Sequence, residues 1–188
     1  MTFHRKWLHR LVLLVLPVLF CHPGTLPAAA DGLPALRGGP VPAERRIPAA
    51  DTAFTGLDGE PRNLADFRGR TLLVNFWASW CAPCLREMPA LDRLRQALDG
   101  EDFHILAISV DTNAAVARNF LEQRLGLPDL PSYHDARMRL ARALDVSALP
   151  ATLILDRQGR IAYRHDGPAA WDSDSAIRLI RQVMAAPE

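Results

Sequence analysis

Two cysteines stand between an apolar run and a helical pattern, and no other feature of the chain constrains its fold as strongly. Residues 71–77 (TLLVNFW) are nearly all apolar, which is typical of a strand buried on both faces of a sheet. After the cysteines, five apolar residues recur at the spacing of an amphipathic helix: Leu85, Met88, Leu91, Leu94 and Leu98. Pro83 suits the first helical turn, because its missing N–H would have no partner there. Cys81 and Cys84 therefore lie where a buried strand meets a helix N-terminus.

The rest of the sequence predicts an α/β fold in which helices flank a central mixed sheet. Further strands are expected at residues 103–110, 151–155 and 160–165, and further helices at residues 116–125, 138–144 and 177–184. The turn Asp156-Arg157-Gln158-Gly159 joins the last two strands as a hairpin. The order strand, helix, strand, helix, hairpin, helix indicates that parallel and antiparallel strands share one sheet.

The first 30 residues have the features of an export signal peptide. A positively charged start precedes an apolar run at residues 11–20, and Ala28-Ala29-Ala30 offers the small residues that signal peptidase prefers. We expect cleavage before Asp31 and a periplasmic location. The apolar run is shorter than the roughly 20 residues of a bilayer-spanning helix. An uncleaved signal that tethers the protein to the membrane is the alternative, and Cys21 would allow a lipid anchor, although a small residue usually precedes a lipidated cysteine and Phe20 is large.

Residues 31–50 are rich in proline and glycine, which oppose regular helices and central strands. We therefore expect a flexible leader over residues 31–50 and one folded domain over residues 51–188.

The charge and cysteine counts exclude several classes of protein. The full sequence has 22 Lys plus Arg against 21 Asp plus Glu, a balance that gives no electrostatic support for nucleic-acid binding. Residues 31–188 contain no lysine, so a Schiff base on lysine is impossible. They keep two thiols, Cys81 and Cys84, which are too few to form a disulfide framework. We expect neither a cofactor nor a bound metal, and we expect a monomer.

The cysteine pair itself predicts thiol-disulfide chemistry. Backbone N–H groups and the dipole at a helix N-terminus favour a thiolate, so Cys81 is the expected nucleophile. Cys84 lies one turn further on and can attack the Cys81 sulfur once that sulfur is bonded to a substrate. A structural disulfide is one alternative, but a loop of only four residues would stabilise the fold little. A zinc site is another, but three histidines show no paired ligand spacing: His104, His134 and His165.

The motifs resemble those of a known family. WCAPC after VNFWAS, with Leu149-Pro150-Ala151-Thr152 opening a later strand, resembles the thioredoxin fold. The segment CLREMP at residues 84–89 is similar to the exported TlpA/ResA-like thiol-disulfide oxidoreductases, which include the cytochrome c maturation thioredoxins. The resemblance implies a cis peptide bond at Pro150, beside the active-site disulfide, and an inserted segment before that strand. It also implies that the backbone of Leu149 pairs with substrate, in keeping with the recognition of extended segments at exposed edges.

Asn75 departs from cytoplasmic thioredoxins, which carry a buried aspartate at this position. An amide cannot titrate, so another base is needed. Glu87 follows Cys84 by three residues on the same helix face, and both this placement and the resemblance make it the candidate for proton transfer. Trp77 is expected in the core, and Trp80 is expected at the surface as an apolar contact for substrates.

These features predict a protein disulfide reductase. Ala82-Pro83 resembles the dipeptide of reducing thioredoxins, and the resemblance implies electrons from a membrane thiol donor and targets such as apocytochrome c or copper-site assembly proteins. Two alternatives stay open. A disulfide oxidase would use the same residues, and a copper-binding chaperone would use Cys81, Cys84 and His134, which is expected in a loop.

Overall fold

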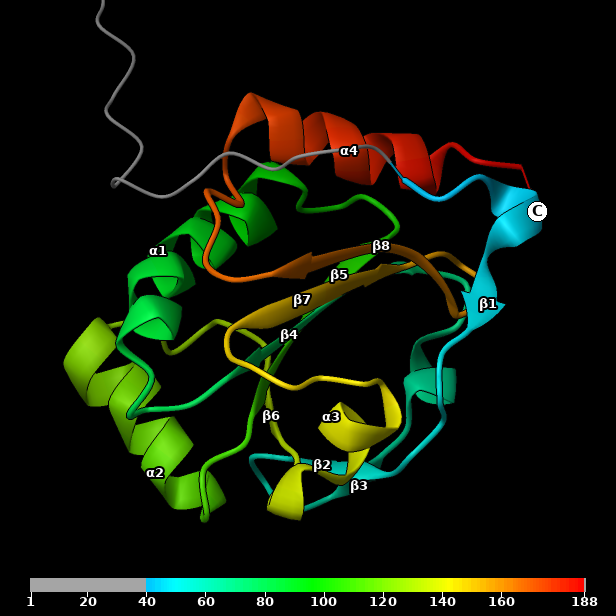
Figure 1. Ribbon diagram of the computed structural model, residues 1–188. Helices are drawn as coiled ribbons and strands as arrows, with labels where there is room; N and C mark the ends of the chain where they lie inside the picture. The colour runs from blue at the N-terminus through cyan, green and yellow to red at the C-terminus, as the bar shows by residue number, and fades with distance from the viewer. Residues whose placement is uncertain (1–39, 188) are drawn as a thin grey trace, which may run out of the picture.

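A mixed sheet of eight strands organises the chain in the computed structural model, which describes residues 40–187. The strand order is β1-β8-β7-β4-β5-β6-β2-β3 (Figure 1). The strands are β1 (Ile47–Pro48), β2 (Phe54–Gly56), β3 (Pro61–Arg62), β4 (Thr71–Trp77), β5 (Phe103–Ser109), β6 (Ser132–His134), β7 (Ala151–Leu155) and β8 (Arg160–Asp166). β4 is parallel to β5 and antiparallel to β7. The predicted α/β fold with a mixed sheet is confirmed.

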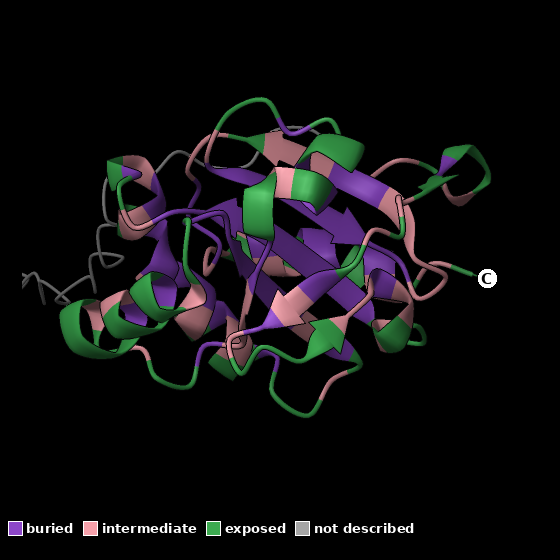
Figure 2. Cartoon of the chain, turned by 90° about the horizontal axis from the view of Figure 1, so that it is seen from below, coloured by how far each residue is buried: buried purple, intermediate pink, exposed green. Residues whose placement is uncertain are grey.

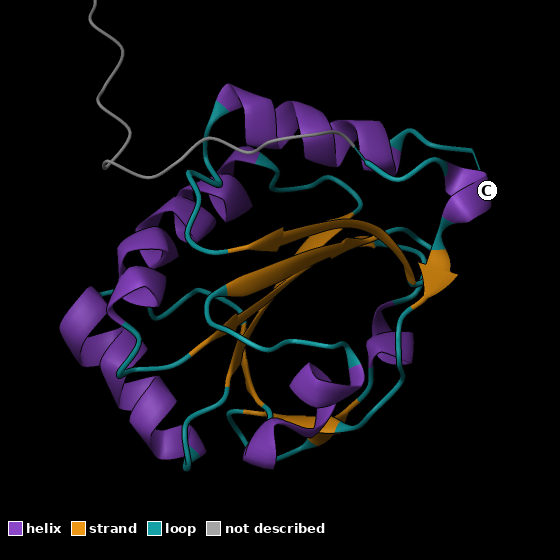
Figure 3. Ribbon diagram, in the orientation of Figure 1, coloured by secondary structure: helices purple, strands orange, loops and turns teal. Residues whose placement is uncertain are grey.

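The helices lie on both sides of this sheet (Figures 1 and 3). They are α1 (Ala82–Ala97), α2 (Ala114–Asn119), α3 (Arg139–Ala143) and α4 (Asp174–Met184), and a π-helical turn (Phe120–Leu125) extends α2. Three 3-10 turns complete the described elements: Ala43–Arg45, Leu64–Phe67 and Ala136–Met138. α1 contacts β5 and α4 contacts β4 and β7, so these two helices cover one face. α3 lies on the opposite side in Figure 1, and a loop joins it to β7.

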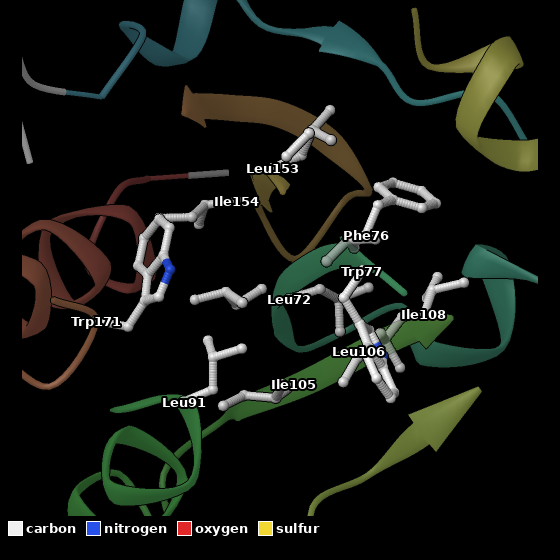
Figure 4. Packing of buried hydrophobic residues seen from close by; sticks show 14 of the residues in the cluster. Leu72, Phe76, Trp77, Leu91, Ile105, Leu106, Ile108, Leu153, Ile154 and Trp171 are labelled. Carbon is white, nitrogen blue, oxygen red and sulfur yellow. The ribbon is translucent and has the colours of Figure 1, made fainter. Parts of the chain in front are cut away.

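The core is built around β4, whose seven residues are all buried. Figure 2 shows the buried interior along the central strands. The labelled side chains in Figure 4 come from the central strands, from α1 and from the segment before α4: Leu72, Phe76, Trp77, Leu91, Ile105, Leu106, Ile108, Leu153, Ile154 and Trp171. A strand with a partner on each side and apolar cover on each face places its C-terminal end, and hence Cys81, at a fixed position.

Residues 40–50 differ from the expected flexible leader. The backbone N–H of Val41 donates to the carbonyl of Ala162 at 2.6 Å, and β1 pairs with β8. Arg46 forms a buried ion pair with Asp156, at 3.2 Å between Nη1 and Oδ2. Pro48 is tolerated because β1 is an edge strand. The ion pair of Arg46 and the backbone pairing with β8 order this segment despite its prolines. The predicted signal peptide and residues 31–39 lie outside the described residues.

Candidate active site

Cys81 and Cys84 form a disulfide at the N-terminus of α1, with 5.3 Å between their Cα atoms. Cys81 is the N-cap residue, and its sulfur accepts a hydrogen bond of 3.3 Å from the backbone N–H of Cys84. The two sulfurs differ in access, since Cys81 retains 5% of its exposed area and Cys84 retains none. A partner molecule can therefore reach Cys81 first, as the sequence predicts.

Glu87 lies on α1 one turn beyond Cys84 and is completely buried. Its Oε1 accepts a 2.8 Å hydrogen bond from Asn75 Nδ2, and its Oε2 accepts bonds of 3.0 Å from the backbone N–H of Ala169 and from Trp171 Nε1. Burial disfavours the carboxylate and is the largest effect, whereas the three donors favour it. The balance raises the pKa of Glu87 from 4.5 to about 7. This carboxyl group can take up or release a proton near neutral pH.

Asn75 links the Glu87 carboxyl group to the central strands of the sheet. It pairs with Thr152 across β4 and β7, and its Nδ2 also donates to Thr152 Oγ1 at 2.9 Å. One amide group thus links the strand before the disulfide, the strand after Pro150 and the helix that carries Glu87. The donors from Ala169 and Trp171 could not be inferred from the sequence, because they come from a segment more than 80 residues after Glu87 that only the folded chain brings near.

A groove of about 600 Å³ opens beside Cys81. Most of its lining is apolar: Trp80, Cys81, Ala82, Pro83, Met138, Ser147, Ala148 and Leu149. Trp80 is 71% exposed, and the peptide bond between Leu149 and Pro150 is cis. The site residues singled out in the sequence are therefore close together: Trp80, Leu149 and Cys81 share one groove, and Cys84 and Glu87 lie behind it on α1.

A buried polar network supports the loop that carries Trp80, and the sequence analysis missed it. The carboxylate of Asp111 accepts hydrogen bonds from the backbone N–H and the hydroxyl of Ser79 and from the hydroxyl of Ser109. The Asp111 carbonyl accepts a 2.7 Å bond from Nε2 of His134. An acidic residue directly after a predicted buried strand was the sequence signal for Asp111.

The expected loop position of His134 is wrong. His134 is the last residue of β6 and is buried. Because a carbonyl oxygen can only accept, Nε2 of His134 carries the proton in its bond to Asp111. Within residues 40–187, no group of three or more His, Cys, Asp or Glu side chains is arranged to hold a metal ion. No helix in the same residues is long and apolar enough to span a bilayer.

Comparison with known proteins shows the family of the chain. The family model described as Redoxin matches residues 40–179. The chain belongs to the Redoxin family. It is 34% identical over 113 residues to the thiol-disulfide oxidoreductase ResA of Geobacillus kaustophilus, a match that covers 60% of this chain and 64% of that protein, slightly less than two thirds.

Two solved structures share the fold. A DsbF homologue from Corynebacterium diphtheriae matches with a TM-score of 0.65 and 26% identity, over 80% of this chain and 99% of that one. A secreted thiol-disulfide isomerase from Corynebacterium glutamicum matches with a TM-score of 0.64 and 28% identity, over 75% and 90% of the two chains. The thioredoxin-like fold that the motifs predict is therefore confirmed by these two structures.

Proposed function

We propose that this chain is an extracytoplasmic thiol-disulfide oxidoreductase that reduces disulfides in target proteins. The observation that carries thiol-disulfide exchange is the asymmetry of the cysteine pair, and the reducing direction rests on the resemblance of Ala82-Pro83 to the dipeptide of reducing thioredoxins. Cys81 lines an open groove, whereas Cys84 is fully buried one turn from a buried carboxyl group whose pKa is about 7. The similarity to the ResA protein and to the secreted isomerase supports the same activity and the same side of the membrane.

The reaction consists of two exchange steps. The Cys81 thiolate attacks one sulfur of the target disulfide, forming a mixed disulfide and releasing the other target sulfur as a thiolate, which takes up a proton. Cys84 then attacks Cys81 Sγ, which forms the Cys81–Cys84 disulfide and releases the second target thiol. The target gains two electrons and the protein loses two. A thiol donor outside the chain must return the disulfide to the dithiol, and we propose a membrane protein for this role.

Glu87 supplies the base for the second step. Cys84 is a nucleophile only as a thiolate, and its burial keeps bulk water away from its proton. Glu87 accepts that proton, directly or through one water, and a carboxyl group with a pKa of about 7 is well matched to proton transfer at neutral pH. Asn75, Ala169 and Trp171 hold the carboxyl group in place.

The groove recognises the target. Trp80 and Leu149 both line it, and the family resemblance implies that the backbone of Leu149 pairs with an extended target segment. Apocytochrome c or a copper-site assembly protein are the targets that the family resemblance implies. An oxidase would share this geometry and differ in the relative stability of its two redox states. A copper chaperone would need Cys81, Cys84 and His134 to meet, and in residues 40–187 no three such side chains are arranged to hold a metal ion.

Export and domain organisation belong to the same proposal. Residues 1–30 act as a cleaved signal peptide, and the functional unit is one thioredoxin-like domain that works as a monomer. Uncleaved, the same residues would tether it to the membrane facing the periplasm.

Trapping of the mixed disulfide tests this function. The Cys84→Ala variant of the exported protein should accumulate disulfide-linked complexes with target proteins through Cys81, because the second step cannot occur. The double variant Cys81→Ala with Cys84→Ala is the matched control and should trap nothing. Absence of complexes in the single variant, with every disulfide-bonded candidate target supplied, would overturn the proposal.

A further inference from the structure

The groove beside Cys81 borders a second hollow that is lined by arginine. Met138 lines the groove, and its two chain neighbours, Arg137 and Arg139, line a hollow of about 360 Å³ together with Ala136. Both arginines are exposed, and so is Arg142 one turn later. In residues 40–187, these three guanidinium groups form no ion pair. Arg137 and Arg139 therefore place two positive charges without an ion-pair partner beside the apolar groove, and Arg142 adds a third exposed arginine one turn along α3.

An unusual backbone turn, stabilised by hydrogen bonds, sets the positions of Arg137, Met138 and Arg139. Arg137 and Met138 both have left-handed φ values, of 63° and 55°, which non-glycine residues rarely adopt. The buried carboxylate of Asp135 fixes the turn, because it accepts hydrogen bonds from the backbone N–H groups of Arg139, Leu140 and Ala141. The turn thus presents Met138 to the groove and the arginines to the neighbouring hollow at the same time.

None of the residues that line this hollow is acidic. Asp135 is fully buried and uses its oxygens on backbone N–H groups. Asp145 is exposed beyond α3, and Asp166 is paired with Arg164. The local charge contrasts with residues 31–188 as a whole, which carry 19 arginines against 21 acidic residues. A general attraction of acidic molecules to the protein would therefore not be expected.

We propose that the groove and the arginine-lined hollow form one docking surface for a target segment that is apolar beside its disulfide cysteine and acidic a few residues away. The proposal rests on the function proposed above and specifies the target. The apolar residue packs against Trp80 and Met138, and the acidic side chains pair with Arg137 and Arg139. Charge complementarity of this kind selects among partners and speeds their encounter.

Reduction of matched disulfide peptides tests the proposal. All peptides have the same length and the same apolar residue beside the cysteine, and they differ in one dipeptide, which is Glu-Glu, Gln-Gln or Arg-Arg. One series places this dipeptide on the N-terminal side of the cysteine, and a second series places it on the C-terminal side. At low salt, the reduced protein should turn over the Glu-Glu peptide with a kcat/KM about tenfold above that of the Arg-Arg peptide in one series, a size expected for two exposed charge pairs. The ratio should fall towards one in about 0.5 M salt.

Two double variants separate local from general charge effects. Arg137→Gln with Arg139→Gln should bring the ratio to about one. Arg124→Gln with Arg178→Gln removes two exposed arginines elsewhere and should keep the ratio of the unmodified protein. Equal rates for the acidic and basic peptides in both series, or a preference that the first double variant leaves unchanged, would overturn the docking surface.

A small neutral disulfide separates loss of the docking surface from loss of thiol-disulfide exchange itself. If the reduced protein reduces a small, uncharged, linear disulfide such as 2-hydroxyethyl disulfide but treats all peptides alike, the docking proposal alone fails. If it reduces neither, the proposed function fails with it.

Discussion

Asn75 Nδ2 lies 2.8 Å from Glu87 Oε1, so an amide on the central strand donates to the one buried carboxyl group of α1. The donor favours the carboxylate form, while burial opposes it more strongly. The pKa of Glu87 consequently lies at about 7, where a small change in pH alters its protonation. The rate of the second exchange step and the free energy of unfolding should therefore both depend on the protonation of Glu87.

Replacement of Glu87 should slow the second exchange step and change its pH dependence. In the unmodified protein, the rate at which Cys84 resolves a mixed disulfide should rise with pH through an inflection near 7, as the Glu87 carboxylate becomes available. Glu87→Gln should lose this inflection and be slower by about 10- to 100-fold at neutral pH. Stopped-flow measurement of mixed-disulfide decay gives both quantities. Glu122→Gln, at an exposed glutamate, is the control, and an inflection that survives in Glu87→Gln would contradict the role of Glu87.

The stability of the oxidised protein should fall as pH rises from about 4.5 to about 7. Across this range the folded state keeps a proton on Glu87 that the unfolded chain has lost, so each increase in pH favours unfolding. A shift from 4.5 to about 7 corresponds to roughly 3 kcal/mol. Denaturant unfolding at a series of pH values measures the slope, and subtracting the profile of Glu87→Gln isolates this residue. Parallel profiles for the two proteins would show that Glu87 has an ordinary pKa.

Trp80 should contribute to target binding and not to folding. Its side chain is 71% exposed, so Trp80→Ala should change the free energy of unfolding by no more than about 0.5 kcal/mol. The same variant should lower kcat/KM for a protein target by about tenfold, mainly through KM, because an exposed tryptophan at a contact surface often dominates binding. Trp80→Phe should recover most of this loss. Steady-state kinetics with unchanged KM in Trp80→Ala would exclude a contact between Trp80 and the target.

The hydrogen bonds of Asp111 should position the loop that carries Trp80. Asp111→Asn leaves one oxygen to serve Ser79 and Ser109, and an unsatisfied buried group costs about 1–3 kcal/mol. Thermal unfolding measures this loss, and KM for a protein target should rise about threefold because Trp80 is less fixed. Ser79→Ala removes only the hydroxyl bond and should have a smaller effect on both. A loss of stability with no change in KM would make the network purely structural.

The sequence predicted most of the central fold, because long apolar strands and the amphipathic α1 leave few alternatives. β4, β5, β7, β8 and α1 lie close to their expected positions. The short strands β2, β3 and β6 were not predicted, since two or three residues carry no usable periodicity and form only when a neighbour supplies hydrogen bonds. β1 was missed for the same reason.

The candidate site also has a part that local sequence predicts and a part that only the folded chain shows. Cys81, Cys84, Glu87 and Pro150 could be named from local motifs and resemblance. The partners of Glu87 at Ala169 and Trp171, and the network of Asp111 and His134, join segments far apart in the sequence, so only the folded chain shows them. Burial of Glu87, which decides its pKa, was likewise not readable from helix spacing.

The reduction potential of the Cys81–Cys84 pair in the protein from residue 31 onward decides whether the protein reduces or oxidises its targets. Equilibration against defined thiol buffers, with the dithiol fraction measured by alkylation, gives this value. A reductase that depends on an external thiol donor should have a potential near that of thioredoxin, about −270 mV. A value near −120 mV would contradict the proposed direction and make the protein a disulfide donor.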